Sequence, residues 1–598
     1  MTPSYGQPRL PFFLLLPSAT ASLAHSARGR WAGRLILASV LFAAASVGSH
    51  AAASSEAAIQ QELLRQQARE RTLRQQQEPI PDVRLDLQRP TDQGLLPLDE
   101  SPCFKIERIV LDGDAAAQFQ WARGAANSTA GGREDPAIGR CLGTTGMDRV
   151  MRRVQNAIVA RGYVTARILA APQDLRAGTL SLTLIPGRIR TIRFAEGTSA
   201  RATQWNALPA RAGDLLNLRD IEQGLENFKR VPTADADIKI SPGEQPGESD
   251  IVIHWKQAFP VRLTLSVDDS GSKATGKYQG AITVAADHLL TLNDLFYLSF
   301  NHDLGGGVSG EKGTRAYTAH YSLPYGYWLL GLTASDSTYR QSVAGINQTY
   351  LYRGESQNSE LKLSRLVYRD AVRKTTLYLR GWTRTSRNYV EDIEIDNQRR
   401  RTAGWEAALA HREFVGVATL DGRIAYRRGT GAMGALPAPE DATGNGSSRL
   451  QIITADAQLT LPFTLGSQRL RYGLAGRAQW DRTPLVPQDR FAIGGRYSVR
   501  GFDGENMLSA DRGWLIRSDL DVLLGKSGQA FYLGLDYGEV SGRAAQGLVG
   551  TRLAGAVLGL RGGYKGFYYD IFAGQPISKP EGFATADTTA GFNLNWSF

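Results

Sequence analysis

Several features that mark common classes of protein are scarce or missing in this sequence of 598 residues. The apolar run Leu35–Ala45 has 11 residues, whereas a membrane-spanning helix needs roughly 20. The mean hydropathy of −0.27 and a charged fraction of 21% also argue against a helical membrane protein. The 7 His residues are scattered, and we find no Gly-x-Ser-x-Gly elbow, metal-ligand spacing or phosphate-binding loop. The sequence therefore predicts no enzyme, no cofactor and no metal site.

Clustered positive charge is also missing, although the net charge is +11. A nucleic-acid-binding protein concentrates its Lys and Arg residues on one element or face. Here Arg residues are spread between carboxylates along the chain. We interpret the excess as solvated faces and a polar lumen, and we expect no nucleic-acid partner.

The N-terminal residues 1–53 have the pattern of a secretory signal peptide. Arg28, Arg30 and Arg34 precede the apolar run, and small residues follow it with candidate cleavage sites after Ala51 or Ala53. A basic segment, a short apolar run and a small-residue site are what export signals combine. The alternative is a membrane anchor, for which the run is too short.

Only two cysteines are present, Cys103 and Cys141. In an exported chain, two cysteines within one short segment predict a single disulfide. It would close a loop of about 38 residues and stabilise the fold by roughly 3–4 kcal/mol in the chain-entropy model. The alternative, two reduced thiols, is disfavoured by export, and no His accompanies them for metal binding.

Residues 54–78 contain no Gly or Pro and are rich in helix formers, so they predict a helix that ends before Pro79. Its apolar stripe is thin and consists of Ile59, Leu63 and Leu73. A helix that is polar nearly all round is either free in solution or housed in a polar cavity. Residues 79–101, which contain Pro and Asp, are predicted to be a linker.

Two small α+β modules are predicted next, at residues 102–187 and 188–257. In the first, apolar residues recur at helical spacing from Met147 to Ile158, and alternating strands flank them. The second repeats the plan, with a helix from Leu218 to Phe228. Only the pattern recurs between the modules, not the residues.

From residue 258 to residue 598 the apolar residues alternate with a period of two. In the last strand, Phe592, Leu594, Trp596 and Phe598 share one face. A membrane barrel needs this alternation between lipid and lumen. A soluble β-sandwich also alternates, but about 340 residues is long for one sandwich, and aromatic residues gather near the strand ends. The fold class is therefore mainly β, a transmembrane barrel preceded by the two modules and the helix.

We count about 16 strands, which is within the range of single-chain outer-membrane barrels. Their predicted centres are residues 263, 282, 298, 318, 332, 358, 380, 406, 421, 454, 474, 517, 535, 557, 570 and 593. The eleventh and twelfth strands flank a long polar connection, residues 482–511. With the N-terminus in the periplasm, this connection is an external loop by strand parity.

Two sequence motifs together match a known family. The first is Val499-Arg500-Gly501-Phe502 in that loop, and the second lies in a later strand. The strand contains Gly534, Asp536 and Gly538 in a [FG]-x-D-x-G pattern. With these motifs, the chain resembles the outer-membrane transporters of two-partner secretion. These are the haemolysin secretion/activation proteins of ShlB, FhaC and HecB type, and their modules are POTRA domains. The resemblance also rests on the signal, the polar helix, the two modules, Cys103-Phe104, Arg161-Gly-Tyr-Val164 and the terminal Phe598.

The resemblance implies that the loop 482–511 folds back into the barrel and that Arg500 pairs with Asp536. Strand parity agrees, because Phe531, Leu533 and Leu535 would face lipid and Asp536 the lumen. Glycines beside Asp536 would leave room for the loop, and the planar guanidinium of Arg500 has donors that match a carboxylate. In a wet lumen the pair is worth about 1 kcal/mol, and more if Phe502 excludes water.

The resemblance further implies a pore in the bacterial outer membrane with its POTRA domains in the periplasm. Its partners would be a large secreted exoprotein of adhesin or haemolysin type, the membrane lipid, and the barrel-assembly machinery that inserts the chain itself. Trp596 and Phe598 would form the C-terminal signal for that machinery, and the helix 54–78 would plug the resting pore. The alternative is an insertase of the same superfamily, although such relatives usually carry more than two POTRA domains and lack a plug helix.

Overall fold

The computed structural model describes residues 60–78, 81–85, 94–127, 129–130, 133–345 and 347–598. The predicted signal peptide, residues 1–53, lies outside the described residues, as do residues 54–59 of the predicted helix. Within the described ranges, none of the helices combines the length and the apolar character that crossing a membrane requires.

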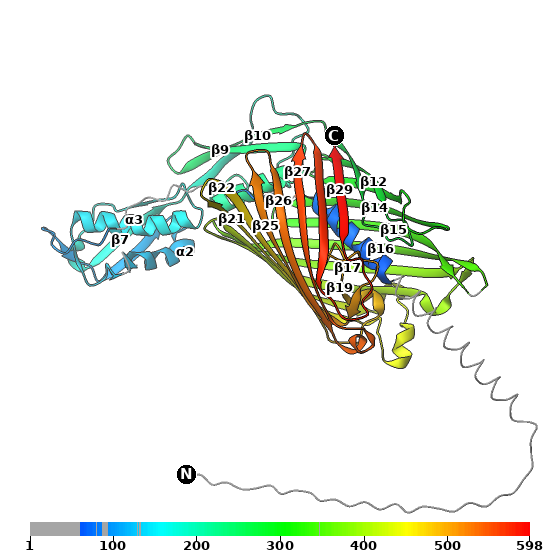
Figure 1. Ribbon diagram of the computed structural model, residues 1–598. Helices are drawn as coiled ribbons and strands as arrows, with labels where there is room; N and C mark the ends of the chain where they lie inside the picture. Colours follow the sequence, from blue (N-terminus) through cyan, green and yellow to red (C-terminus); the bar gives the residue numbers. More distant parts are fainter. Residues whose placement is uncertain (1–59, 79–80, 86–93, 128, 131–132, 346) are drawn as a thin grey trace, which may run out of the picture. The chain divides into compact units, whose positions relative to one another are not determined.

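The largest element of the fold is a closed antiparallel barrel (Figure 1). Its sixteen long strands are β11 (Val261–Asp268), β12 (Gln279–Asp287), β13 (Leu295–Asp303), β14 (Lys312–Tyr325), β15 (Trp328–Ala344), β16 (Thr349–Arg369), β17 (Arg373–Val390), β19 (Arg400–Val415), β20 (Ala418–Thr430), β21 (Gln451–Leu465), β22 (Gln468–Asp481), β25 (Arg512–Leu524), β26 (Gln529–Ser541), β27 (Arg552–Tyr564), β28 (Phe567–Ser578) and β29 (Thr589–Ser597).

Each strand pairs with its neighbours in sequence, and β29 closes the barrel by pairing with β11, with Trp596 opposite Leu265. A two-residue strand, β18 (Ile393–Glu394), pairs only with the C-terminal end of β17. All sixteen predicted strand centres lie inside observed strands. The predicted fold class is confirmed.

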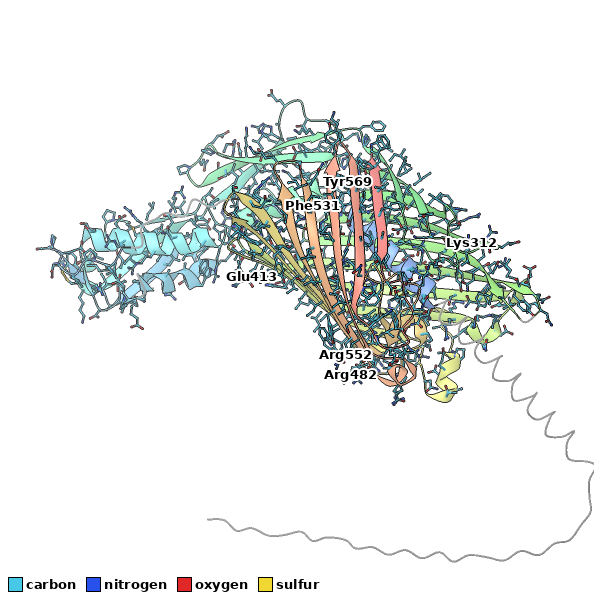
Figure 2. All side chains as sticks on the ribbon, viewed as in Figure 1. Lys312, Glu413, Arg482, Phe531, Arg552 and Tyr569 are labelled. Atoms are coloured by element: carbon cyan, nitrogen blue, oxygen red, sulfur yellow. A yellow bond between two sulfur atoms is a disulfide. The ribbon has the colours of Figure 1, made fainter. Side chains whose placement is uncertain are left out.

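The alternation of apolar and polar residues sets which face of each strand points outward. In β26, Phe531 (labelled in Figure 2), Leu533 and Leu535 are about half exposed on the outside. Tyr532 and Asp536, which take the alternate positions of the strand, are buried. Because side chains alternate across a sheet, a one-residue shift would place Asp536 in lipid.

The first small module has a three-stranded sheet in the order β2 (Arg108–Gly113), β7 (Thr179–Ile185), β6 (Arg167–Leu169). The helix α3 (Thr144–Ala160) packs on it through Val150, Val154 and Ile158, which are fully buried. The remaining elements are β1 (Phe104–Lys105), α2 (Ala116–Phe119), η1 (Gln120–Asn127), β3 (Thr129–Ala130), β4 (Arg133–Glu134), β5 (Cys141–Leu142) and η2 (Leu175–Ala177). The short helices α2 and η1 were not predicted from the sequence.

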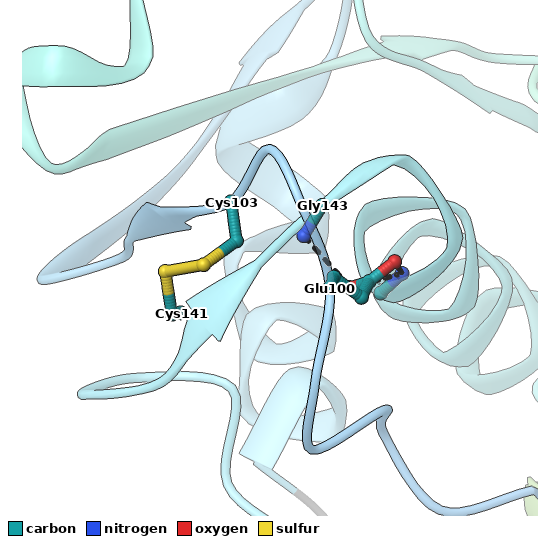
Figure 3. The surroundings of a disulfide bond; sticks show 5 residues. Glu100, Cys103, Cys141 and Gly143 are labelled. Atoms are coloured by element: carbon teal, nitrogen blue, oxygen red, sulfur yellow. Dashed lines mark hydrogen bonds between the residues drawn. A yellow bond between two sulfur atoms is a disulfide. The ribbon is translucent and has the colours of Figure 1, made fainter.

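The two cysteines of this module form a disulfide, Cys103–Cys141, which ties the start of the module to β5 (Figure 3). Beside it, Glu100 accepts hydrogen bonds from the backbone N–H groups of Gly143 and Gly146 at the start of α3. Burial acts to raise the pKa of Glu100, but these donors outweigh it and the pKa is lowered.

Part of the predicted linker belongs to the first module. Leu96 is buried in the module's apolar core, and its N–H donates to Asp135 at 2.8 Å. With Glu100 capping α3, residues 94–101 are integral to the module, whereas the sequence predicts that they belong to the linker 79–101. No sustained period marks this packing, because the segment is short and interrupted by Pro97, and of its three leucines Leu96 is buried whereas Leu95 and Leu98 are exposed.

The second module contains the sheet β8 (Arg188–Phe194), β10 (Glu248–Gln257), β9 (Ala234–Pro242) and the covering helix α4 (Leu218–Lys229). Its apolar cluster continues into the barrel, because Ala285, Leu295 and Tyr297 belong to the same cluster. Arg230 crosses the junction and donates to Asn293 O at 3.0 Å and to Ser322 Oγ at 2.7 Å. The module is therefore joined to the barrel by apolar and polar contacts.

Candidate functional site

The connection 482–511 between β22 and β25 folds into the barrel. It contains η6 (Pro487–Asp489) and a small antiparallel hairpin of β23 (Phe491–Ile493) and β24 (Leu508–Ala510). The tip of the hairpin carries Val499 and Phe502, whose exposed fractions are 0% and 4%. The hairpin places this tip against the inner faces of β25–β28.

Arg500 lies at the tip and binds the carboxylate of Asp536 in β26. Its Nε donates to Oδ2 at 2.7 Å, its Nη2 donates to Oδ1 at 2.7 Å, and its backbone N–H donates to Oδ2 at 2.8 Å. Arg500 is 5% exposed and Asp536 3%. A bidentate, buried pair of this kind fixes both distance and orientation.

The glycines of the two predicted motifs are the points of closest approach between loop and wall. A Cβ on Gly534 would lie 2.6 Å from Arg500 Nη2, and one on Gly538 would lie 2.8 Å from Val499 Cγ2. Gly501 has a φ of +93° and faces the carbonyl oxygen of Gln575 in β28, so any other residue there is strained and obstructed. The structure thus brings all seven predicted motif residues together.

Three participants were missed by sequence reasoning. Asp519 in β25 accepts a second hydrogen bond from Arg500 Nη2. Gly555 in β27 lies under the carbonyl of Arg500, and Gly574 in β28 lies under Gly501, where a Cβ would be 3.0 Å from its Cα. Strand parity in β25, where Trp514 and Ile516 are exposed, was a signal that could have identified Asp519.

An apolar cluster surrounds the ion pair on the side of the loop. It consists of Phe491, Ile493, Val499, Phe502, Leu508, Ala510, Leu515, Val540, Leu553 and Phe583. The rings of Phe502 and Phe583 meet edge to face at 5.9 Å. This cluster excludes water from the pair, which strengthens its electrostatic attraction.

The loop also contacts both edges of the seam that closes the barrel. Arg496 Nη1 donates to Asp269, next to β11, at 2.9 Å, and Arg496 Nη2 donates to Phe592 O in β29 at 3.2 Å. Asp269 itself accepts the N–H of Phe592 at 2.9 Å. At the other end of β29, Trp596 and Phe598 are exposed, and Phe598 N–H donates to Leu263 O at 2.9 Å.

A helix of residues 60–77 also lies in the lumen (blue in Figure 1). Its contacts with the wall and the loop are mainly polar. They join Gln60 to Ser509, Glu62 to Thr275, Arg65 to Gly504, Arg69 to Gln279 and Asn301, and Arg74 to Glu360. Leu63 and Leu73 are its partly buried apolar contacts.

The wall opposite the helix carries a ladder of alternating charges. Starting from Arg74 of the helix, ion pairs within 3.6 Å connect Glu360 (β16), Arg380 (β17), Glu406 (β19), Arg423 (β20), Asp456 (β21) and Arg477 (β22). Each carboxylate lies between two cations, and the four arginines exceed the three carboxylates by one charge. Among the described residues, no group of three His, Cys, Asp or Glu is placed to hold a metal ion.

Comparison with known families gives three matches that together cover most of the described chain. Residues 247–562 match the family "Haemolysin secretion/activation protein ShlB/FhaC/HecB". Residues 104–187 match the ShlB-type POTRA domain, and residues 188–242 match a second POTRA domain.

Individual relatives agree with these matches. The chain is 39% identical to the outer membrane transporter CdiB-2 of Burkholderia pseudomallei over 92% of this chain and 95% of that one. It is 26% identical to the hemolysin transporter protein ShlB of Serratia marcescens over 67% of this chain and 71% of that one. Among solved structures, CdiB from Acinetobacter baumannii superposes with a TM-score of 0.80 at 34% identity, covering 91% of this chain and 99% of that one. CdiB from Escherichia coli gives a TM-score of 0.75 at 25% identity, with the same coverage.

Proposed function

This chain belongs to the haemolysin secretion/activation protein family of ShlB, FhaC and HecB, and we propose that it secretes one large exoprotein through its barrel. It is a two-partner secretion transporter of the outer membrane, with its POTRA domains on the periplasmic side. The cargo class that its relatives' names suggest includes haemolysins.

The observation that carries the proposal is the polar helix inside a polar lumen. The wall carries the ladder of ion pairs, and the helix 60–77 binds it through side chains such as Arg69 and Arg74. Water or a passing polypeptide can replace such contacts at little net cost. We propose that the helix plugs the resting pore and leaves it when cargo enters.

Cargo transport runs without ATP in this proposal. The sequence has no phosphate-binding loop. The free energy comes from cargo binding in the periplasm and from cargo folding outside. Among the described residues, β2 and β6 are the edge strands of the first POTRA sheet and β8 and β9 those of the second, and an extended cargo strand could add to such an edge.

The geometry of the motif residues supports the roles that we propose for them. Arg500 and Asp536 hold the loop against β26, while Gly501, Gly534 and Gly538 provide the space for it. Trp596 and Phe598, exposed at the end of β29, serve the barrel-assembly machinery as the C-terminal signal.

The cargo is tested by deleting the gene for this chain and comparing culture supernatants and cell surfaces. We expect one large polypeptide to disappear and to return when the gene is restored. An unchanged set of secreted polypeptides, with loss instead of several barrel proteins from the membrane, would indicate an insertase.

The plug is tested by removing residues 54–78 and recording single-channel conductance in planar bilayers. We expect a larger and more persistent conductance than in the intact chain. Identical conductance would contradict the plug, while leaving the secretion of cargo to be decided by the deletion strain.

A further inference from the structure

The chain that follows the lumen helix, residues 81–85, lies against the helix α4 of the second POTRA domain. Val83 and Leu85 are half-buried and pack on the apolar cluster of that domain, whereas Asp82 and Arg84, at the alternate positions, are exposed. This alternation is that of an extended chain with one face buried.

Two carboxylates of α4 bind the backbone of this segment. The N–H of Val83 donates to Glu226 Oε1 at 2.9 Å, and the N–H of Leu85 donates to Glu222 Oε1 at 2.9 Å. Residues i and i+2 of an extended chain are roughly 6.6 Å apart, and residues i and i+4 of a helix rise by about 6 Å. The spacing of the two acceptors therefore matches the spacing of alternate N–H groups in an extended chain.

The barrel supplies a donor to the same segment. Arg369, the last residue of β16, donates from Nη2 to Val83 O at 2.6 Å. Its guanidinium also pairs with Glu222 and Glu226, each at 3.0 Å. The side chains of Glu222 and Arg369 are 0% and 2% exposed, so their positions are fixed by burial as well as by charge.

A neighbouring guanidinium keeps spare donors. Arg219 is 4% exposed and binds Glu222 through Nη1. Within the part of the chain that the structure describes, its buried Nε and Nη2 have no hydrogen-bond partner. They can donate to the carbonyl groups of a longer occupant.

We propose that the surface formed by Glu222, Glu226 and Arg369, here named the α4 groove, binds an extended segment of the unfolded exoprotein. Residues 81–85 occupy it at rest as an internal mimic. The three groups bind only the backbone of the mimic, so they accept many sequences with apolar residues at alternate positions. The inference rests on the proposed function, to which it adds an entry site at the periplasmic rim of the barrel.

The position of the mimic links cargo binding to opening. The lumen helix ends at residue 77, four positions before the mimic. When cargo takes the groove, the helix loses this anchor and is free to leave. A tethered segment competes at an effective concentration in the millimolar range, so the groove stays closed to chance peptides.

Peptide binding to the full-length chain in detergent tests the groove. The probe is a fluorescein-labelled peptide with the sequence of residues 79–90. We expect V83D/L85D, which disables the mimic and spares the groove, to lower the Kd of the probe at least tenfold relative to the wild type. Adding E226Q to that variant should raise the Kd at least fivefold. R552A, which changes an exposed side chain outside both the groove and the mimic, should leave the Kd within twofold.

The proposal is wrong if V83D/L85D binds the probe no better than the wild type, or if E226Q leaves binding unchanged. The heat-modifiable mobility of each variant shows that the barrel is folded. E226Q is a conservative change in a side chain that is 12% exposed. The single variants V83D and L85D keep the test usable if the double variant fails to assemble.

Cargo itself is tested with a photo-crosslinking residue at Val372, an exposed position in the turn beside the groove. We expect crosslinks to the large exoprotein in secreting cells. Suppose that deleting the gene removes the exoprotein from the supernatant, but that the residue at Val372 forms crosslinks only within the chain. That result would overturn the groove as an entry site and leave the secretion function intact. If the deletion removes no exoprotein, the secretion function fails, and peptide binding still decides whether the groove accepts an extended chain.

Discussion

Two segments share the lumen of this barrel, and different forces hold them there. The loop 482–511 buries an apolar cluster and Arg500, whose guanidinium donates two hydrogen bonds and whose backbone N–H donates a third to the carboxylate of Asp536. The helix 60–77 is held mainly by hydrogen bonds and ion pairs to a charged wall, and only Leu63 and Leu73 pack against apolar neighbours.

The difference predicts which segment can move. A polar contact exchanged for water has a net value of about 1 kcal/mol, whereas exposing apolar surface costs roughly 25 cal/mol per Å². The helix can therefore leave the lumen at a moderate cost, and the loop cannot. We expect the loop to act as a fixed part of the pore and the helix as its removable part.

The largest effect should come from Arg500→Ala. The change leaves the carboxylate of Asp536, which is 3% exposed, without its bidentate partner, and removing one member of a buried pair costs about 3 kcal/mol. We expect the loop to leave its place and release of the exoprotein to fall at least tenfold, measured in culture supernatant, while membrane insertion persists.

Two matched variants sharpen this prediction. Arg500→Lys keeps the charge without the planar fork, and we expect intermediate secretion. Arg552→Ala removes a guanidinium that is 67% exposed and should change nothing. Normal secretion by the Arg500→Ala variant would refute the fixed role of the loop.

A smaller loss is expected from Gly555→Ala, which adds one carbon where the carbonyl of Arg500 meets the wall. The loop must shift to relieve the overlap, and overpacking of this kind costs about 1–3 kcal/mol. Secretion should fall severalfold, and an external protease should cleave the loop faster. Gly381→Ala in β17, where a Cβ meets no atom within 4 Å, is the control; an equal loss in both variants would argue against specific docking.

For the helix, Arg74→Ala should have a mild effect in the opposite direction. Glu360 loses Arg74 but keeps Arg380 at 2.9 Å. Glu78, which lies 3.9 Å from Arg74, keeps His320 Nε2 at 3.2 Å. A loss of about 1 kcal/mol corresponds to roughly a fivefold increase in the frequency of pore opening in bilayers. A loss of secretion as large as that of Arg500→Ala would show that the helix is not the weaker of the two.

The smallest effect is expected from salt. Raising the ionic strength from 0.1 to 1 M shortens the Debye length from about 10 to about 3 Å. Openings attributed to the helix should become up to severalfold more frequent, while protease protection of the loop stays unchanged because its pair is shielded by the apolar cluster. Release of both segments together would contradict their different attachment.

The sequence predicted the barrel well because the alternation that marks a strand can be recognised within a few neighbouring residues. Alternation with a period of two placed each of the sixteen centres within a strand, including β26, whose parity directs Asp536 inward. It failed where local signals are weak. The short helices α2 and η1 of the first module and the hairpin of β23 and β24 lack a sustained period.

The candidate site was predicted in part. Arg500 and Asp536 were singled out through a family resemblance together with strand parity. Asp519, Gly555 and Gly574 were missed because their contribution depends on which strands lie beneath the returning loop. Glycine can occur in a strand for many reasons. Only the tertiary structure shows that glycine is needed here because another backbone approaches closely.

By itself, the sequence determined the strand number, the inward and outward faces, the two small domains and a disulfide between its only two cysteines. These follow from periodicity and composition, which act over a few neighbouring residues. Only the tertiary structure decided that Arg500 lies against Gly555 and that residues 81–85 rest on Glu222 and Glu226. Such contacts join residues tens to hundreds of positions apart, and barrel closure, strand register and loop packing together bring them within reach.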